Sequence, residues 1–143
     1  EKTLTESVNN STTLQNDDEL VSASLPANTT WLLEAYIRYV AAVDASGDMK
    51  YLWTYPAGAI AETQGASMTN TADSGNAAPY LDGGGAVAFG IATTQRVSLL
   101  RGTVDIEGTA GALTLQWAQN AAVAQNYSIG GYGWLMLRRV ADI

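Results

Sequence analysis

Short apolar segments separated by turn-forming residues run along most of this chain, and they restrict its fold more than any other feature. The segments are rich in Val, Ile, Leu, Thr, Tyr and Trp, which favour β-strands. The clusters between them tolerate turn geometry or exclude ladder hydrogen bonds. These clusters are Pro26-Ala27-Asn28, Ser46-Gly47-Asp48, Pro56-Ala57-Gly58 and Gly108-Thr109-Ala110-Gly111. The pattern predicts an all-β sandwich or barrel.

We expect about eight strands. A length of 143 residues fits one compact domain. We therefore divide the chain into an N-terminal arm or first strand, residues 1–15, and a single β-sandwich domain, residues 16–143. The expected strands are Thr3–Val8, Glu19–Leu25, Trp31–Val43, Met49–Tyr55, Ala86–Ile91, Val97–Glu107, Ala112–Ala118 and Tyr132–Val140.

Two stretches lack a strand pattern. From Ala59 to Gly85 the sequence consists mainly of Gly, Ala, Ser, Thr and Asn, so we interpret residues 59–85 as a long loop, with a short strand near Ala66–Thr71 as an alternative. Gly83-Gly84-Gly85 near its end reads as a hinge, because the Lys-Ser/Thr of a phosphate-binding loop does not follow. Ala118–Gln125 has no helical apolar stripe and is also predicted to be a loop.

Several expected strands are apolar on both faces. In Trp31–Val40 the odd positions carry Trp, Leu, Ala, Ile and Tyr, and the even positions carry Leu, Glu, Tyr, Arg and Val. A single domain has one core, so the second face requires cover, and another subunit is the simplest source. We therefore predict a homotrimer. Its interface residues are Glu34, Tyr36, Arg38, Leu99, Arg101, Trp134, Met136 and Arg138, with the charges as cross-subunit pairs; the alternative places these strands near the sandwich edge with exposed arginines.

Composition excludes several classes of function. Histidine and cysteine, which serve as general bases and as ligands for transition metals, are both absent. A net charge of −7 and a pI near 4.2 oppose binding to nucleic acid. No segment has the length of about 20 apolar residues that a membrane span needs. We expect a non-enzymatic protein with no cofactor, nucleic acid or membrane partner.

Two acidic groups are candidate sites. Asp17-Asp18-Glu19, with Asp82 or Asp44 and Asp48, could supply oxygen ligands to calcium, but the spacing is not that of a calcium loop and a solvated turn is favoured. Glu34, Glu62 and Glu107 could contribute to a glycosidase carboxylate pair; an ion pair or solvent exposure is the ordinary interpretation. We therefore predict no metal site and no catalytic residue.

Four aromatic residues form a candidate platform for a ligand or host glycan: Tyr51, Trp53, Tyr55 and Tyr80. The first three alternate along one expected strand and would share a face. Apolar sugar faces pack on exposed rings, whereas the alternative interpretation is packing in the core or between subunits.

Three stretches resemble a group of small β-structured virion proteins from tailed bacteriophages. They are Val8–Leu20 (VNNSTTLQNDDEL), Leu25–Ala35 (LPANTTWLLEA) and Gly111–Asn120 (GALTLQWAQN), and the ending Gly133–Val140 (GWLMLRRV) is similar to the last strand of such modules. The resemblance covers most of the chain except residues 59–85. It implies a jelly-roll trimer akin to the tumour-necrosis-factor fold, and it carries over no catalytic residues.

The resemblance implies a structural role on the exterior of the virion. Members of the group are head decoration proteins, head fibres or tail-tip modules. We expect a capsid decoration protein that binds the major capsid protein and stabilises the head, with Glu1–Leu20 as a clamping arm. The alternative is a receptor- or glycan-binding module at a tail fibre or tail tip.

Overall fold

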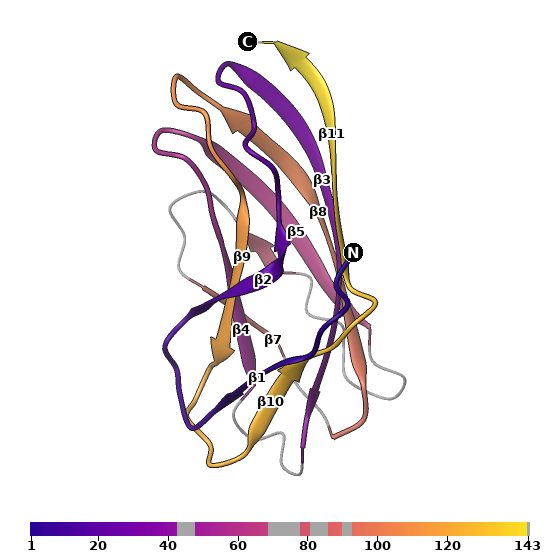
Figure 1. Ribbon diagram of the computed structural model, residues 1–143. Coiled ribbons are helices and arrows are strands. Elements are labelled where there is room, and N and C mark those ends of the chain that lie inside the picture. The colour runs from indigo at the N-terminus through magenta and orange to yellow at the C-terminus, as the bar shows by residue number, and fades with distance from the viewer. Residues whose placement is uncertain (43–47, 69–77, 81–85, 90–92, 143) are drawn as a thin grey trace.

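The computed structural model describes residues 1–42, 48–68, 78–80, 86–89 and 93–142. These residues form strands and connections, and none of them forms a helix long and apolar enough to cross a membrane. The strands make a seven-stranded sheet and a four-stranded sheet, which lie face to face (Figure 1). The strands are β1 (Glu6–Asn9), β2 (Gln15–Val21), β3 (Thr29–Ala41), β4 (Met49–Thr54), β5 (Ile60–Met68), β6 (Ala78–Tyr80), β7 (Val87–Phe89), β8 (Arg96–Ile106), β9 (Thr114–Gln119), β10 (Asn126–Ile129) and β11 (Trp134–Asp142).

The strand pairs are nested in the manner of a jelly roll. β1 pairs with β10, β2 with β9, β3 with β8 and β4 with β7, all antiparallel. The chain is therefore one long antiparallel hairpin wound so that successive strands alternate between the two sheets. This arrangement confirms the predicted antiparallel jelly-roll sandwich.

Three strands lie outside the nested pairs. β5 pairs with β8 along nine residues and β6 pairs with β5, so the prediction of a loop throughout residues 59–85 is wrong. β11 pairs with residues 29–36 of β3, on the same edge whose residues 39–41 pair with β10, so the two strands follow one another along that edge (Figure 1). β10 was not expected either, whereas residues 120–125 before it are the predicted loop. Residues 81–85, with the glycine hinge, lie outside the described part of the chain.

Two of the predicted turns show the positive φ angles and backbone hydrogen bonds of tight turns. Asn28 adopts a positive φ of 55° and its N–H donates to the carbonyl of Glu107. Gly58 has a φ of 84°, which suits a residue without a side chain, and Ala59 N–H donates back to the Pro56 carbonyl at 3.1 Å. These turns set where β3 and β5 begin.

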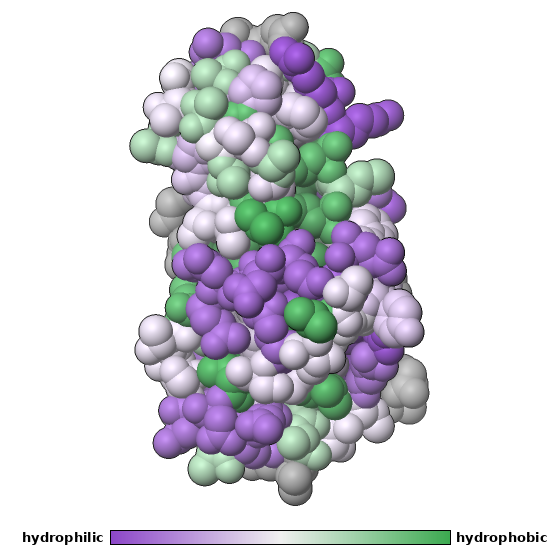
Figure 2. Space-filling model, viewed as in Figure 1, coloured by the Kyte–Doolittle hydropathy of each residue, from purple (hydrophilic) through white to green (hydrophobic). Residues whose placement is uncertain are grey.

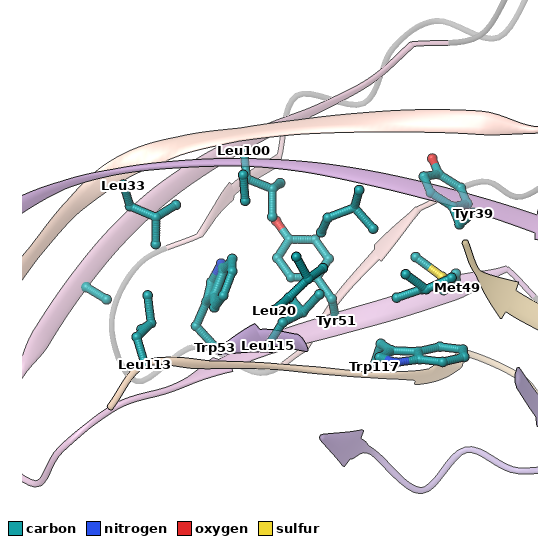
Figure 3. Packing of buried hydrophobic residues seen from close by; sticks show 14 of the residues in the cluster. Leu20, Leu33, Tyr39, Met49, Tyr51, Trp53, Leu100, Leu113, Leu115 and Trp117 are labelled. Carbon is teal, nitrogen blue, oxygen red and sulfur yellow. The ribbon is translucent and has the colours of Figure 1, made fainter. Parts of the chain in front are cut away.

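The core fills the space between the two sheets (Figure 3). The large sheet contributes odd positions of β3 and even positions of β8, such as Leu33, Tyr39 and Leu100. The small sheet contributes large aromatic rings, Trp53 and Trp117 among them. Alternation within each strand thus sends one set of side chains into a shared core, as expected from the sequence.

Glycine at position 102 permits the close approach of β5 to β8. A Cβ atom at Gly102 would lie 1.9 Å from the carbonyl oxygen of Glu62, which is a fixed backbone atom. No other residue type fits there without movement of β5. The sequence alone does not reveal this contact, because β5 itself has no apolar alternation.

We predict that Gly102→Ala lowers the free energy of unfolding by about 1–3 kcal/mol, the usual cost of overpacking. Thermal and urea unfolding would measure it. Gly108→Ala is the matched control, because nothing lies within 4 Å of a Cβ at Gly108. Equal stability of the two variants would contradict this account.

Candidate assembly surface and N-terminal ion cluster

The predicted interface residues all lie on the outer face of the large sheet. Cross-strand pairing places Tyr36 opposite both Leu99 and Trp134, and Glu34 opposite both Arg101 and Met136. The neighbouring pairs add Arg38 and Arg138 to the same face. The structure thus brings all eight residues together, on strands β3, β8 and β11. We call this surface the outer face.

Side chains on the outer face contact one another within the chain. The Tyr36 and Trp134 rings stack, with centroids 6.1 Å apart and an interplanar angle of 7°. Arg101 Nε lies 2.7 Å from Glu34 Oε1, so these two charges pair within one chain. Because the pair joins directly opposite residues on neighbouring strands, it needs no other molecule.

Arg38 is also held within the chain. Its Nη1 donates to the Gly131 carbonyl at 3.1 Å, and its Nη2 donates to the side chain of Gln95. The guanidinium carbon lies 5.1 Å from the ring centroid of Tyr132, in cation–π geometry. Tyr132 is the most exposed large apolar side chain among the described residues, at 72%. Tyr132 could not be predicted as an outer-face residue from the strand pattern, because its position depends on the loop between β10 and β11.

The outer faces of the two sheets differ in chemistry. That of the small sheet is mostly polar, and Gln116 donates to Asn16 across it. Figure 2, which looks onto the side with β2 and β9, shows hydrophilic residues across the middle of the molecule and a hydrophobic patch above them. By contrast, the outer face of the large sheet presents these partly exposed apolar residues: Leu32, Tyr36, Val40, Val97, Leu99, Trp134 and Met136.

Charges on the outer face balance. Among the described residues it carries three arginines, Arg38, Arg101 and Arg138, and three carboxylates, Glu34, Glu62 and Asp105. The whole chain carries a net charge of −7, so the excess negative charge lies elsewhere. Two copies of the chain would therefore repel each other least across this surface.

The aromatic platform predicted for a ligand does not form an exposed surface. Tyr51 and Trp53 point into the core, where their exposed fractions are 0% and 2% (Figure 3). Tyr55 packs partly buried against the same cluster. The side chain of Tyr80 lies outside the described residues. The alternating aromatic residues of β4 lie on the inward face of the strand. The predicted ligand contact by Tyr51 and Trp53 is therefore wrong, and both residues pack in the core.

A buried ion cluster ties the N-terminus to both sheets. The Lys2 ammonium has no exposed surface; its Nζ lies 3.0 Å from Asp17 Oδ2, 3.8 Å from Glu19 Oε2 and close to Glu6. Glu6 belongs to β1 in the large sheet and Asp17 to β2 in the small sheet. Lys2 also pairs through its backbone with Tyr132 and Gly133. Glu1–Leu20 is therefore part of the sandwich, and residues 1–15 contain a first strand and not a free arm.

Hydrogen bonds shift two ionisation equilibria in this cluster. Burial by itself lowers the pKa of Lys2, but the hydrogen bonds to Glu6 and Asp17 raise that pKa above its ordinary value. The Thr3 hydroxyl and the Leu4 and Thr3 backbone N–H groups donate to Glu19 and lower the pKa of its carboxyl. All of these contacts favour the charged forms.

The acidic run is not the solvated turn that we expected. Asp17 is buried in β2, and its carboxylate accepts the N–H groups of Glu19 and Leu20 where the pairing with β9 is interrupted. The buried carboxylate is compensated by Lys2, a partner 15 residues away. No group of three or more His, Cys, Asp or Glu side chains suited to a metal ion occurs among the described residues; Asp44 and Asp82 lie outside them.

The comparisons with known proteins provide no relative. No protein-family model matches this chain, and no curated protein or solved structure compared with it is similar to it.

We predict that Lys2→Met costs about 3–5 kcal/mol of unfolding free energy, because Asp17 is left buried without a counter-charge. Asp17→Asn added to Lys2→Met should recover part of that loss, since the amide oxygen still accepts the two backbone N–H groups. Urea unfolding of the four proteins in the cycle measures this coupling. Additive losses would show that the pair is not coupled.

The lowered pKa of Glu19 predicts that its contribution to the stability of the fold depends on pH. Its folded-state pKa lies below the unfolded value of 4.5, so its contribution is present above that pH and is lost as the pH falls through the folded pKa. We expect the melting temperatures of the natural chain and Glu19→Gln to differ at pH 6 and to approach each other as the pH is lowered below 4.5 and through the folded-state pKa. A constant difference over this range would rule out the charge of Glu19 as the cause.

Proposed function

We propose that this protein is a non-enzymatic structural protein that assembles into a homotrimer through the outer face of its large sheet. The observation that carries the proposal is the uncovered apolar surface on β3, β8 and β11. A sheet normally has one face on a core and a polar face in water, as the small sheet does here. The large sheet instead carries partly exposed apolar residues among the charges of its outer face, in addition to its apolar core face.

The composition of the outer face favours another copy of the chain as its partner. Its arginines and carboxylates are equal in number, so the face has no net charge to oppose the approach of another copy of this acidic chain. Tyr, Trp, Met and Arg, which are enriched in protein interfaces, are concentrated there, and Met136 remains 48% exposed. The number of three subunits comes from the resemblance to phage virion proteins.

Within this proposal the trimer decorates the head of a tailed bacteriophage. The jelly-roll sandwich agrees with the fold that the resemblance implies, and a trimer that bridges capsid subunits would add binding surface to the shell. A receptor- or glycan-binding module at the tail receives less support, because Tyr51 and Trp53 of its predicted platform are buried.

We predict that light scattering gives a mass three times the 15.0 kDa of one chain at micromolar concentration. Leu99→Glu, which introduces a charge on the outer face, should give monomers. Leu52→Glu is the matched control, since Leu52 is also partly exposed but lies on the outer face of the small sheet, opposite Gln116. A monomeric natural protein would contradict the proposal.

Imaging of phage particles tests the assigned location. An antibody or a fused tag on this protein should mark the surface of the head in electron micrographs. Label confined to the tail tip would favour the receptor-binding alternative. Label on neither structure would leave the assembly without a virion role and overturn the decoration proposal.

A further inference from the structure

Tyr132 combines two features that packing inside the chain does not explain. Its backbone adopts a φ of 67°, in the left-handed region that bulky residues rarely occupy. Its ring is nonetheless 72% exposed, so the conformation does not serve to bury it in the core. Such strained residues persist where the surroundings hold them, and they concentrate at functional sites.

The surroundings of Tyr132 hold its loop firmly. Tyr132 N–H donates to the Lys2 carbonyl at 2.7 Å, and Lys2 N–H donates to the Gly133 carbonyl at 2.7 Å. The flanking glycines allow this approach, because a Cβ at Gly131 would lie 2.9 Å from the Thr3 carbonyl oxygen. The Lys2 backbone that makes these two hydrogen bonds is itself held by the ion pairs of the Lys2 side chain with Glu6 and Asp17. The N-terminal residues therefore hold the β10–β11 loop in place.

The ring itself belongs to the outer face. It lies against the guanidinium of Arg38, whose two hydrogen bonds to Gly131 and Gln95 keep the pair in place. Trp134, two residues further on, stacks on Tyr36 at the same end of β3. Pre-positioned aromatic rings beside arginine are typical of the residues that dominate binding energy in protein interfaces.

We propose that Tyr132 is a principal contact residue for a second copy of this chain, and that Lys2 is its positioning residue. The inference rests on the proposed assembly through the outer face and names the residue on which that assembly depends. A second copy is the occupant that the balanced charge of this face favours.

Sedimentation equilibrium of Tyr132→Asn tests the contact. Asparagine tolerates a positive φ, so the variant should keep its fold, which circular dichroism checks. We expect its subunit dissociation constant to rise at least tenfold, while Tyr132→Phe, which keeps the ring, stays within about threefold of the natural value. Natural affinity in Tyr132→Asn would overturn the inference and leave the proposed assembly intact. A monomeric natural protein would overturn both.

A second measurement tests the positioning role of Lys2. Lys2→Met should weaken association in the natural background at temperatures where circular dichroism shows a native fold. In the Tyr132→Asn background it should have no further effect, because the residue that it positions is already gone. Equal effects in both backgrounds would refute positioning. If Lys2→Met does not fold, Glu19→Gln replaces it, since Glu19 binds the same N-terminal residues.

Discussion

The long central strand β3 is the element on which the other layers depend. Its thirteen residues pair with β8 along one edge and with both β10 and β11 along the other. Its odd positions supply the core, and its even positions form the middle of the outer face. One strand thus supplies both the core of the monomer and the middle of the surface through which we propose that it associates. A shift of register by one residue would exchange the two sets of side chains, so pairing on both edges protects function as well as stability.

The ion cluster at Lys2 and the apolar core contribute differently to the fold. A buried pair of charges costs desolvation that its attraction barely recovers, so Lys2 and Asp17 contribute little net stability over an apolar pair. Their contribution is to fix the position of the N-terminal residues on the sandwich. The ammonium can satisfy Asp17, Glu6 and Glu19 only when β1, β2 and the residues before them meet at one point. The cluster therefore specifies where the N-terminal residues dock, and through them where the β10–β11 loop lies.

The sequence pattern predicted the strands and the core better than it predicted individual contacts between side chains. Alternation along β3, β8 and β11 was strong enough to place the core and all eight outer-face residues, because each strand has large side chains on both faces. β5 was missed because its described inward positions carry only the small residues Ala61 and Thr63. The burial of Lys2 and the pairing of Glu34 with Arg101 depend on which strands become neighbours, and single-strand patterns carry no such information.

The strand edges on one side of the sandwich have features that oppose association by strand addition. β11 pairs only with β3, so its second edge could recruit a strand from another molecule. It bears the adjacent charges of Arg138 and Arg139, and its register shifts between Arg139 and Ala141. Charges and bulges of this kind oppose strand addition. β2, at the edge of the small sheet, has interrupted pairing with β9, and its Glu19 is engaged by Thr3 and Leu4. Both of these edges therefore oppose strand addition, which supports the proposed association through the outer face of the large sheet over association through these edges.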